Sequence, residues 1–353
     1  MHNMKLAVDV RMLGSGGIGS YIEALLPYFL KNFECTLIGS EEQLSSVSSL
    51  KADCDCIFEE CEIKPFSIKE LLFFPQKTAN LINQCDAYYT PYCNIPKGIK
   101  IPVYSTIHDV VFLDVPGLAS KSGTIIRKLF YKYAAFRSKL IFTVSDFSRQ
   151  RILFHLKTKK PVIVTYNAVP SWFSKNENES LKRENKILFV GNIKKHKGLS
   201  VLIDAFAKAK KQGLTAKLLI TGNSENFRTA DTDIFAKLEN EEDILFTGKI
   251  SNEELKNLYK KVSILVQPSF YEGFGMPPLE ALSLGCHVVM SDIPVFKEIY
   301  DGFPVTFFEA GNSDDLAEKI LLECKKADEP ISVPEKYSFE KTFEIIKKSL
   351  EQI

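Results

Sequence analysis

The sequence has no strong excess of charge of either sign. Its 353 residues include 45 Lys and Arg and 44 Asp and Glu, for a formal net charge of +1. Nucleic-acid-binding domains usually carry a marked basic excess, so this balance argues against nucleic acid as a partner. Hydrophobic residues make up 45% of the chain, which excludes a disordered or fibrous protein and is enough for two domains.

The sequence also lacks the patterns of a zinc site, a redox pair and a membrane span. None of its eight cysteines has Cys-x-x-Cys spacing, and the closest cluster, Cys54, Cys56 and Cys61, has no histidine near it. No signal peptide opens the chain, and no run approaches the roughly 20 apolar residues that a span needs. We therefore expect a cytoplasmic protein with reduced thiols.

A carboxylate metal site is not expected either. Two Asp-x-Asp triplets occur, Asp53-Cys-Asp55 and Asp231-Thr-Asp233. Such a triplet binds a divalent cation when an apolar strand carries it to a binding cleft, and neither is preceded by such a strand. We predict that both are chance occurrences.

Short apolar runs alternate with helical stretches along the whole chain. A helical apolar pattern over 22–33 contains Pro27, which should kink it, and 41–74 shows no clear period. The polar stretch 175–185 is typical of a linker, and Ser251 with Glu254 forms a capping box. Strands are predicted at 5–10, 36–39, 103–107, 141–145, 162–166, 187–191, 217–222, 244–248, 264–268, 287–291 and 305–308.

This alternation predicts an α/β fold with two doubly wound, Rossmann-like domains that meet at a cleft. Apolar strands separated by helices form parallel sheets that are covered on both faces. We expect one domain over 1–170, a second over 171–336, and a terminal helical segment over 337–353.

The first candidate site is the glycine-rich run Gly14-Ser-Gly16-Gly17-Ile-Gly19. Glycine lets the backbone approach a phosphate, and the following helix offers free N–H groups. A dinucleotide site would place this motif directly after its strand, with an acid about 20 residues on. Here three residues intervene and Glu41 comes late, so a simple turn of the chain remains an alternative.

The second candidate site runs from Ser269 to Leu282 and reads SFYEGFGMPPLEAL. Pro277 and Pro278 are typical of a first helical turn, which predicts that a helix amino end with its positive dipole is directed at a ligand such as a diphosphate. Glu280 is expected in that first turn, and Glu272 lies eight residues before it. Carboxylates accept hydrogen bonds from a ribose diol or sugar hydroxyls. The alternative is that both glutamates are solvated.

These residues resemble the retaining nucleotide-sugar glycosyltransferases of family 4, which have the two-domain GT-B fold. Glu272 and Glu280, with Gly273, Phe274 and Gly275 between them, match the signature of that family. Nearly the full length of the chain takes part, and further matching segments are 9–19, 106–109, 144–148, 166–168 and 190–206.

The resemblance implies a role for each matching residue. Glu280 would hold the ribose of the donor, and Glu272 with the Gly273–Met276 backbone would hold the transferred sugar. Lys197 would hold the diphosphate, and the expected catalytic residues are His108, Lys197 and Glu272. The remaining donor-binding residues would be Gly16, Gly17, Gly191, Gly273, Phe274, Gly275 and Met276.

One departure from the family concerns the phosphate loop. Many members carry an arginine shortly after the glycine that corresponds to Gly191, whereas this chain has Asn192. Lys197 is a compact charge that cannot bind phosphate in the bidentate way of arginine. Lys194 or Lys195 would supply a second charge, unless both are solvated.

His108 and the basic segment 121–160 each leave two interpretations open. His108 is either a satisfied histidine at a strand end or a site residue that donates to a sugar hydroxyl, and we do not expect it to be the general base. Residues 121–160 contain eleven basic residues against Asp146. They form either an anionic membrane contact, or a helix whose apolar stripe of Ile126, Leu129, Phe130 and Tyr133 belongs to the core.

The resemblance therefore implies a retaining hexosyltransferase that needs no metal and no cofactor. Its substrates would be a nucleotide sugar, with guanosine diphosphate mannose as our expectation, and a glycan or lipid-linked acceptor in surface polysaccharide synthesis. The protein would work in the cytoplasm or at the inner face of the cell membrane. The alternatives are a nucleotide-sugar epimerase or phosphorylase of the same plan, a non-catalytic nucleotide-sugar or carbohydrate-binding protein, and a Rossmann dehydrogenase.

Overall fold

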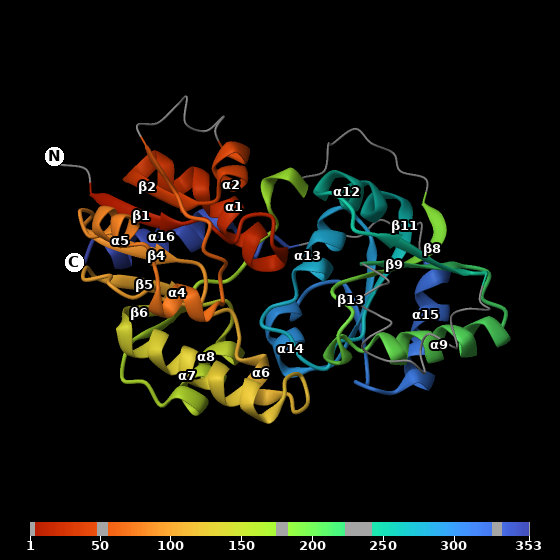
Figure 1. The fold of residues 1–353 in the computed structure, drawn as a ribbon. Coiled ribbons are helices and arrows are strands. Elements are labelled where there is room, and N and C mark those ends of the chain that lie inside the picture. Colours follow the sequence, from red (N-terminus) through yellow and green to blue (C-terminus); the bar gives the residue numbers. More distant parts are fainter. Residues whose placement is uncertain (1–3, 48–55, 174–182, 223–241, 327–333, 353) are drawn as a thin grey trace. The chain divides into compact units, whose positions relative to one another are not determined.

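The computed structural model describes residues 4–47, 56–173, 183–222, 242–326 and 334–352 (Figure 1). The chain divides into two compact units. Unit 1 comprises residues 1–167 and 337–353, and unit 2 comprises residues 168–336.

Unit 1 contains a seven-stranded, fully parallel sheet in the order β3-β2-β1-β4-β5-β6-β7. The predicted strands are present with small changes at their ends, and β3 and β4 are two strands that the sequence patterns did not predict. The strands are β1 (Lys5–Asp9), β2 (Glu34–Gly39), β3 (Ile57–Glu60), β4 (Ala87–Thr90), β5 (Val103–Thr106), β6 (Ser138–Thr143) and β7 (Val162–Val164).

Helices lie between most of the successive strands of this sheet. They are α1 (Gly16–Asn32), α2 (Glu41–Ser46), α4 (Ile68–Leu72), α5 (Gln76–Ile82), α6 (Val111–Asp114), α7 (Lys121–Arg137), α8 (Asp146–Leu156) and α16 (Phe339–Leu350). Pro27 lies inside α1, and the helix continues past it.

The last helix, α16, belongs to unit 1 although it follows unit 2 in the sequence. It packs against α1, and Figure 1 shows it among the elements of unit 1. The ring of Phe343 lies 5.4 Å from that of Tyr28, 5.5 Å from that of Phe29 and 6.2 Å from that of Phe33. Burial of these rings stabilises the contact, because large aromatic side chains contribute most to core packing.

Unit 2 contains a six-stranded parallel sheet in the order β10-β9-β8-β11-β12-β13. All six strands predicted in this half are present. They are β8 (Glu184–Val190), β9 (Lys217–Thr221), β10 (Ile244–Gly248), β11 (Val262–Gln267), β12 (His287–Ser291) and β13 (Val305–Phe308), and the helices are α9 (Leu199–Lys211), α12 (Asn252–Lys261), α13 (Met276–Ser283), α14 (Pro294–Tyr300) and α15 (Ser313–Lys325). Ser251 and Glu254 form the predicted capping box at the start of α12.

Both sheets reverse their strand order at one point, which is where ligands bind in open parallel sheets. In unit 1 this point lies between β1 and β4, and in unit 2 it lies between β8 and β11. The residues that follow these four strands are therefore placed at the two edges where a ligand would be expected.

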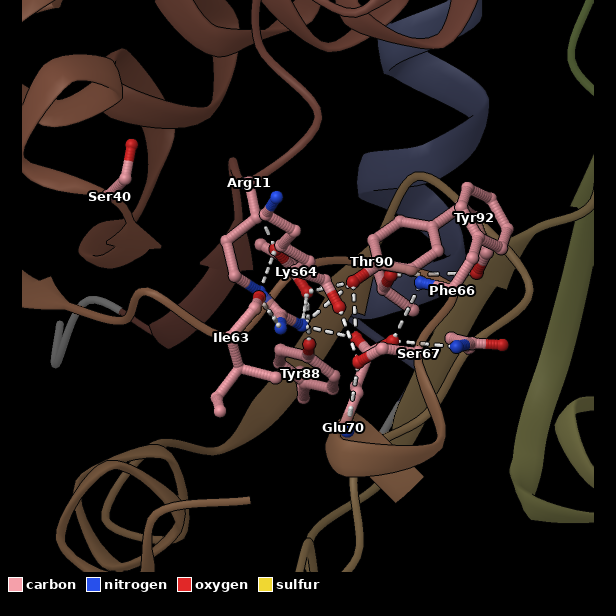
Figure 2. A network of polar contacts seen from close by, with 12 residues as sticks. Arg11, Ser40, Ile63, Lys64, Phe66, Ser67, Glu70, Tyr88, Thr90 and Tyr92 are labelled. Carbon is pink, nitrogen blue, oxygen red and sulfur yellow. Dashed lines mark hydrogen bonds and ion pairs between the residues drawn. The ribbon is translucent and has the colours of Figure 1, made fainter. Parts of the chain in front are cut away.

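In unit 1 this edge is filled by a buried network of charged side chains (Figure 2). The guanidinium Nη2 of Arg11 lies 2.6 Å from Asp9 Oδ2 and 2.6 Å from Glu70 Oε1. Tyr88 donates to Asp9 at 2.7 Å, and Tyr92 donates to Glu70 at 2.5 Å. The network attaches the segment around α4 to the ends of β1 and β4.

Burial dominates the electrostatics of this network. It raises the pKa of Glu70, although the Arg11 charge acts in the opposite direction. Asn94 also donates to Glu70, at 2.6 Å. Two buried carboxylates thus share one cation and several neutral donors, and the loss of that cation would leave both without a positive charge.

We expect Arg11→Met to lower the free energy of unfolding by about 3–5 kcal/mol, because it leaves Asp9 and Glu70 buried without their cation. Urea denaturation at pH 7.5, followed by circular dichroism, measures this change. The matched control is Arg149→Met, which removes the exposed pair with Asp146 and is expected to cost about 0–1 kcal/mol. A loss no larger than that of the control would contradict a structural role for the network.

Candidate active site

The residues predicted to bind a donor gather at the edge of unit 2 where the strand order reverses. Gly191 to Gly198 follow β8, and Pro268 to Gly275 follow β11, its direct neighbour in the sheet. Because the carboxyl ends of parallel strands meet at one edge, the two loops lie side by side. The backbone N–H of Phe270 donates to the carbonyl of His196 at 2.8 Å, which joins the loops directly.

Lys197 and Glu272 form an ion pair across these two loops. The ammonium Nζ of Lys197 lies 2.7 Å from each carboxylate oxygen of Glu272. Glu272 Oε1 also accepts from Ser269 Oγ at 2.8 Å and from Gln267 Nε2 at 3.2 Å. Four donor contacts therefore fix the orientation of one carboxylate. The sequence patterns pointed to Lys197 and Glu272 and to a motif that begins at Ser269, but they did not single out Gln267, which lies just before that motif.

Two glycines allow the loops to take this shape. A Cβ atom on Gly198 would lie 1.9 Å from the carbonyl oxygen of Pro268, so no other residue fits between the loops without a backbone shift. Gly275 has φ +87°, and a Cβ atom there would lie 2.4 Å from the ring of Phe296. Glycine is the residue that adopts such a positive φ without strain.

Helix α13 begins directly after Gly275, as the two prolines predicted. An ordinary helix start leaves four backbone N–H groups without acceptors. The start of α13 offers fewer donors than we expected, because proline has no backbone N–H. Pro277 and Pro278 occupy two of those four positions. The N–H groups of Gly275 and Met276 remain, which suits one or two oxygen atoms better than a whole diphosphate.

Glu280 lies deeper in α13 than the sequence suggested. The helix begins at Met276 and its first turn contains no acid, so Glu280 lies in the second turn. Its carboxylate is buried, and its Oε2 accepts from the hydroxyl of Tyr259 on α12 at 3.0 Å. Burial raises the pKa of Glu280 to about 7, although the Tyr259 hydrogen bond acts in the opposite direction.

The other polar residues of the loop after β8 differ in exposure. Asn192, Lys194 and Lys195 are exposed, whereas His196 is buried. Burial and the neighbouring Lys197 charge lower the pKa of His196 to about 4, so the imidazole is neutral near pH 7. No hydrogen-bond partner of its Nδ1 is found in the described part of the chain.

Unit 1 holds the remaining predicted residues. Helix α1 begins at Gly16, and its N-cap Ser15 makes no side-chain capping bond. The N–H groups of Gly16 and Gly17 therefore have no acceptor within the helix, and a Cβ atom on either glycine would meet nothing within 4 Å. This start of α1 is open to an oxygen ligand, and the role of both glycines stays a prediction.

His108 follows β5 and is hydrogen-bonded to the carbonyl oxygen of Pro91, 3.0 Å from its Nε2. A carbonyl only accepts, so Nε2 carries the proton and Nδ1 is left as an acceptor. Burial lowers the pKa of His108 to about 4. In this tautomer the neutral ring offers a sugar hydroxyl an acceptor rather than the donor that we expected, and the role of His108 in the site stays a prediction.

The apolar stripe of the basic segment is not core. On α7 the side chains of Leu129 and Phe136 are 59% and 75% exposed, and Ile126 and Tyr133 are exposed as well. The buried side of the helix consists of Tyr131, Ala134 and Ala135. The interpretation of 121–160 as a helix whose stripe simply packs into the core is therefore wrong.

Several predictions concern residues outside the described ranges. They include both Asp-x-Asp triplets, Cys54 of the cysteine cluster and most of the 175–185 linker. Among the residues that the structure does describe, there is no group of three His, Cys, Asp or Glu placed to hold a metal ion. In the same residues, no helix combines the length and apolar character needed to cross a membrane.

A comparison with protein families finds a match for the part of the chain that carries the Lys197–Glu272 pair. Residues 170–331 match the model of Glycosyl transferases group 1. The match covers most of unit 2, and both the loop after β8 and the Glu272 to Glu280 motif lie within the matched residues.

Two curated relatives, each of which matches somewhat more than half of this chain, are also glycosyltransferases by name. An uncharacterized glycosyltransferase of Methanocaldococcus jannaschii, MJ1607, is 29% identical over 219 residues, or 58% of this chain and 55% of that protein. The O-antigen chain mannosyltransferase RfbU of Salmonella typhimurium is 31% identical over 204 residues, or 55% of this chain and 53% of that protein. The chain thus spans about half the length of these curated relatives.

The fold is that of the GT-B glycosyltransferases. The crystal structure of Anabaena Alr3699/HepE in complex with UDP and glucose matches with a TM-score of 0.74 at 15% identity. The match covers 99% of this chain and 100% of that one. At this identity the similarity concerns the fold alone, and the predicted roles of the site residues stay predictions.

We expect Glu280→Gln to stabilise the protein at alkaline pH. The raised pKa of Glu280 means that the folded state favours the protonated carboxyl group. Its contribution to stability is complete below the ordinary pKa of 4.5 and is lost as the pH rises through about 7. Glutamine is neutral at every pH, so the variant should exceed the wild type by up to about 3 kcal/mol at pH 8 and match it near pH 5. Urea unfolding at both pH values measures the difference.

The control is Glu253→Gln, which makes the same change at an exposed position on α12. Its unfolding free energy should follow that of the wild type at both pH values within about 0.5 kcal/mol. Equal pH dependence of the wild type and Glu280→Gln would show that the Glu280 carboxyl is not a strained, buried acid.

Proposed function

We propose that this protein is a retaining hexosyltransferase that moves a sugar from a nucleoside diphosphate sugar to a hydroxyl of a glycan or lipid-linked acceptor. The observation that carries the proposal is the Lys197–Glu272 ion pair at the strand-order reversal of a group 1 domain. The name of the Salmonella relative supports a mannose donor and a part in surface polysaccharide synthesis.

Lys197 would compensate the negative charge that develops on the leaving diphosphate. It lies just before α9, whose first N–H groups have no acceptor within the helix. Fixed charges and dipoles of this kind stabilise a transition state because they need no reorganisation during the reaction. Glu272 would hold Lys197 in place and accept hydroxyl hydrogen bonds from the transferred sugar.

The donor's other groups would be bound by the motif that follows β11. The N–H groups of Gly275 and Met276 suit oxygen atoms of the sugar, and the Glu280 carboxylate suits the two ribose hydroxyls. Both positions belong to α13 and its start, where Gly275 lies against the ring of Phe296 and its carbonyl accepts from Tyr300.

The reaction would take place on one side of the sugar ring. The bond between the anomeric carbon and the diphosphate oxygen breaks, and the acceptor oxygen bonds to the same side of that carbon. The acceptor proton moves to the departing phosphate oxygen, so all atoms and charges balance without a protein base. The protein would position the reactants, exclude water and compensate charge.

We propose that this chemistry needs no metal ion and no cofactor. The nucleotide sugar, with guanosine diphosphate mannose as the first candidate, is a substrate. Lys197 and the helix amino ends offer the charge compensation that a divalent cation provides in metal-dependent transferases.

The decisive experiment measures sugar transfer and donor affinity for Lys197→Ala. Nucleotide sugars with guanine, uracil, thymine and adenine bases are first ranked by thermal shift, and the best donor is used in excess chelator. We expect wild-type activity to survive the chelator. Lys197→Ala should lower turnover about 100- to 1,000-fold while donor affinity falls much less, because the leaving charge is largest in the transition state.

Lys211→Ala is the matched control, since Lys211 is exposed at the other end of α9. Loss of activity in chelator that magnesium or manganese restores would contradict the metal-independent reaction. Isomerisation of the donor without acceptor would indicate an epimerase, and binding without any turnover would indicate a sensor.

We further propose that α7 contacts an anionic lipid surface on which a lipid-linked acceptor resides. The helix has no acidic residue, its lysines Lys121, Lys128 and Lys132 are exposed, and Leu129 and Phe136 extend outward beside them. Basic helices with exposed apolar side chains bind such surfaces by insertion and charge attraction.

Co-sedimentation with vesicles tests this contact. The wild type should bind phosphatidylglycerol vesicles and bind phosphatidylcholine vesicles weakly, and Leu129→Gln with Phe136→Gln should reduce binding at least fivefold. Leu322→Gln, at an exposed apolar position on α15, serves as the control. Equal binding to both lipids, or no effect of the α7 changes, would contradict the proposal.

A further inference from the structure

Glu280 has one hydrogen-bonded oxygen and one that remains for a ligand. Its Oε2 accepts from the Tyr259 hydroxyl at 3.0 Å. Within the described part of the chain, its Oε1 has no hydrogen-bond partner and is not among the fully buried unpaired atoms. A carboxylate held in this way can present only Oε1 to a hydroxyl pair.

Tyr259 is well suited to hold that carboxylate. It is the one buried residue of α12, and its ring packs against that of Phe173 with 5.9 Å between the centroids. Burial, together with the Glu280 charge, raises the pKa of the Tyr259 phenol well above its ordinary value. The hydroxyl therefore remains a donor at every pH at which the protein would work.

Arg183 joins the two helices that carry this pair. Its Nη1 donates to the carbonyl oxygen of Tyr259 at 3.0 Å and to that of Val262 at 2.7 Å. Its Nη2 donates to the carbonyl oxygen of Leu284, at the end of α13, at 2.7 Å. The ends of α12 and α13 are thus held by one guanidinium, which keeps Tyr259 at a fixed distance from Glu280.

No charged neighbour is among the causes of the pKa shift of Glu280. Burial raises its pKa, and the Tyr259 hydrogen bond opposes that rise. The titratable neighbours of the pair are Cys286, which follows α13, and Tyr300 of α14, and both act on the pKa of Tyr259. Burial raises the pKa of Cys286 to about 12, so its thiol is neutral as well.

We propose that Tyr259 is a positioning residue for donor binding: its hydroxyl holds Oε2 of Glu280 so that Oε1 accepts from the ribose hydroxyls of a nucleoside diphosphate. This inference rests on the proposed function and adds to it a residue of α12, outside the Glu272 to Glu280 motif. It also predicts how donor affinity depends on pH.

The pH dependence follows from the two hydrogen-bonding states of the carboxyl group. The ionised form accepts strongly from the ribose, whereas protonation makes the carboxyl a weaker acceptor and adds an O–H donor. With a pKa of about 7, affinity should fall as the pH drops through 7. Tyr259 stabilises the ionised form, so removal of its hydroxyl should move the midpoint of this fall to higher pH.

The experiment measures the affinity of UDP, GDP, ADP and TDP by calorimetric titration between pH 5.5 and 9. For the nucleotide that binds best, wild-type affinity should fall about tenfold between pH 8 and pH 6 beyond the fall seen for Glu280→Gln. The Glu280→Gln curve reports the ligand's terminal phosphate, which protonates near pH 6. Tyr259→Phe should have a midpoint at higher pH and be at least fivefold weaker at pH 7.

Tyr104→Phe is the matched control. Tyr104 is fully buried in unit 1, and no partner of its hydroxyl is found among the described residues. Its removal should leave affinity and midpoint unchanged. A second variant at position 259 carries 3-fluorotyrosine, a stronger donor of nearly the same size, which should move the midpoint to lower pH even if Tyr259→Phe folds poorly.

The outcomes separate this inference from the proposed function. If no nucleotide binds the wild type, the proposed function fails and the inference fails with it. If Glu280→Gln weakens binding but Tyr259→Phe keeps the wild-type midpoint, the inference alone fails. If Tyr259→Phe binds the nucleotide more weakly but its pH midpoint is unchanged, Tyr259 acts only through packing of its ring. That result would also overturn the inference.

Discussion

A carboxylate removed from water must find a cation or several hydrogen-bond donors, and this constraint organises both units. Each sheet brings acidic side chains to the edge where its strand order reverses. Glu272 pairs with Lys197, Asp9 and Glu70 share Arg11, and among the described residues Glu280 is bound only by the hydroxyl of Tyr259. Compensation by charge is therefore most complete at Glu272 and least complete at Glu280.

The three arrangements differ in what they leave for a ligand. The Arg11 network is closed, because its guanidinium and carboxylates bind one another and neighbouring tyrosines inside unit 1. The Lys197–Glu272 pair is only half-buried at its lysine end, so an anion of higher charge can compete with the carboxylate for the ammonium. Glu280 is undercompensated, which is the usual sign that a buried polar group has a further partner.

The sequence patterns predicted the features that depend on neighbours along the chain. Alternating apolar runs located the sheets, Ser251 and Glu254 located the start of α12, and Gly275 with two prolines located the start of α13. Strand β3 was missed because it reads IFEE and lies in the stretch 41–74, which shows no clear period. Strand β4 was missed because it reads AYYT, without a branched aliphatic residue. The pairs Arg11–Glu70 and Tyr259–Glu280 join residues 59 and 21 positions apart, so no local pattern indicates them. For α7, the helical period gave the stripe, but the small size of Ala134 and Ala135 decided which side packs inward.

The position of α16 bears on how the chain matures during synthesis. Phe343 completes the aromatic cluster with Tyr28, Phe29 and Phe33 of α1. Residues 168–336 leave the ribosome before α16 does, so unit 2 has all of its sequence available while unit 1 still lacks a helix. Domains generally fold as units in the order of their synthesis. In this protein unit 1 begins first and gains α16 only after unit 2 has been synthesised, so a nascent chain exposes the apolar side of α1 until α16 emerges.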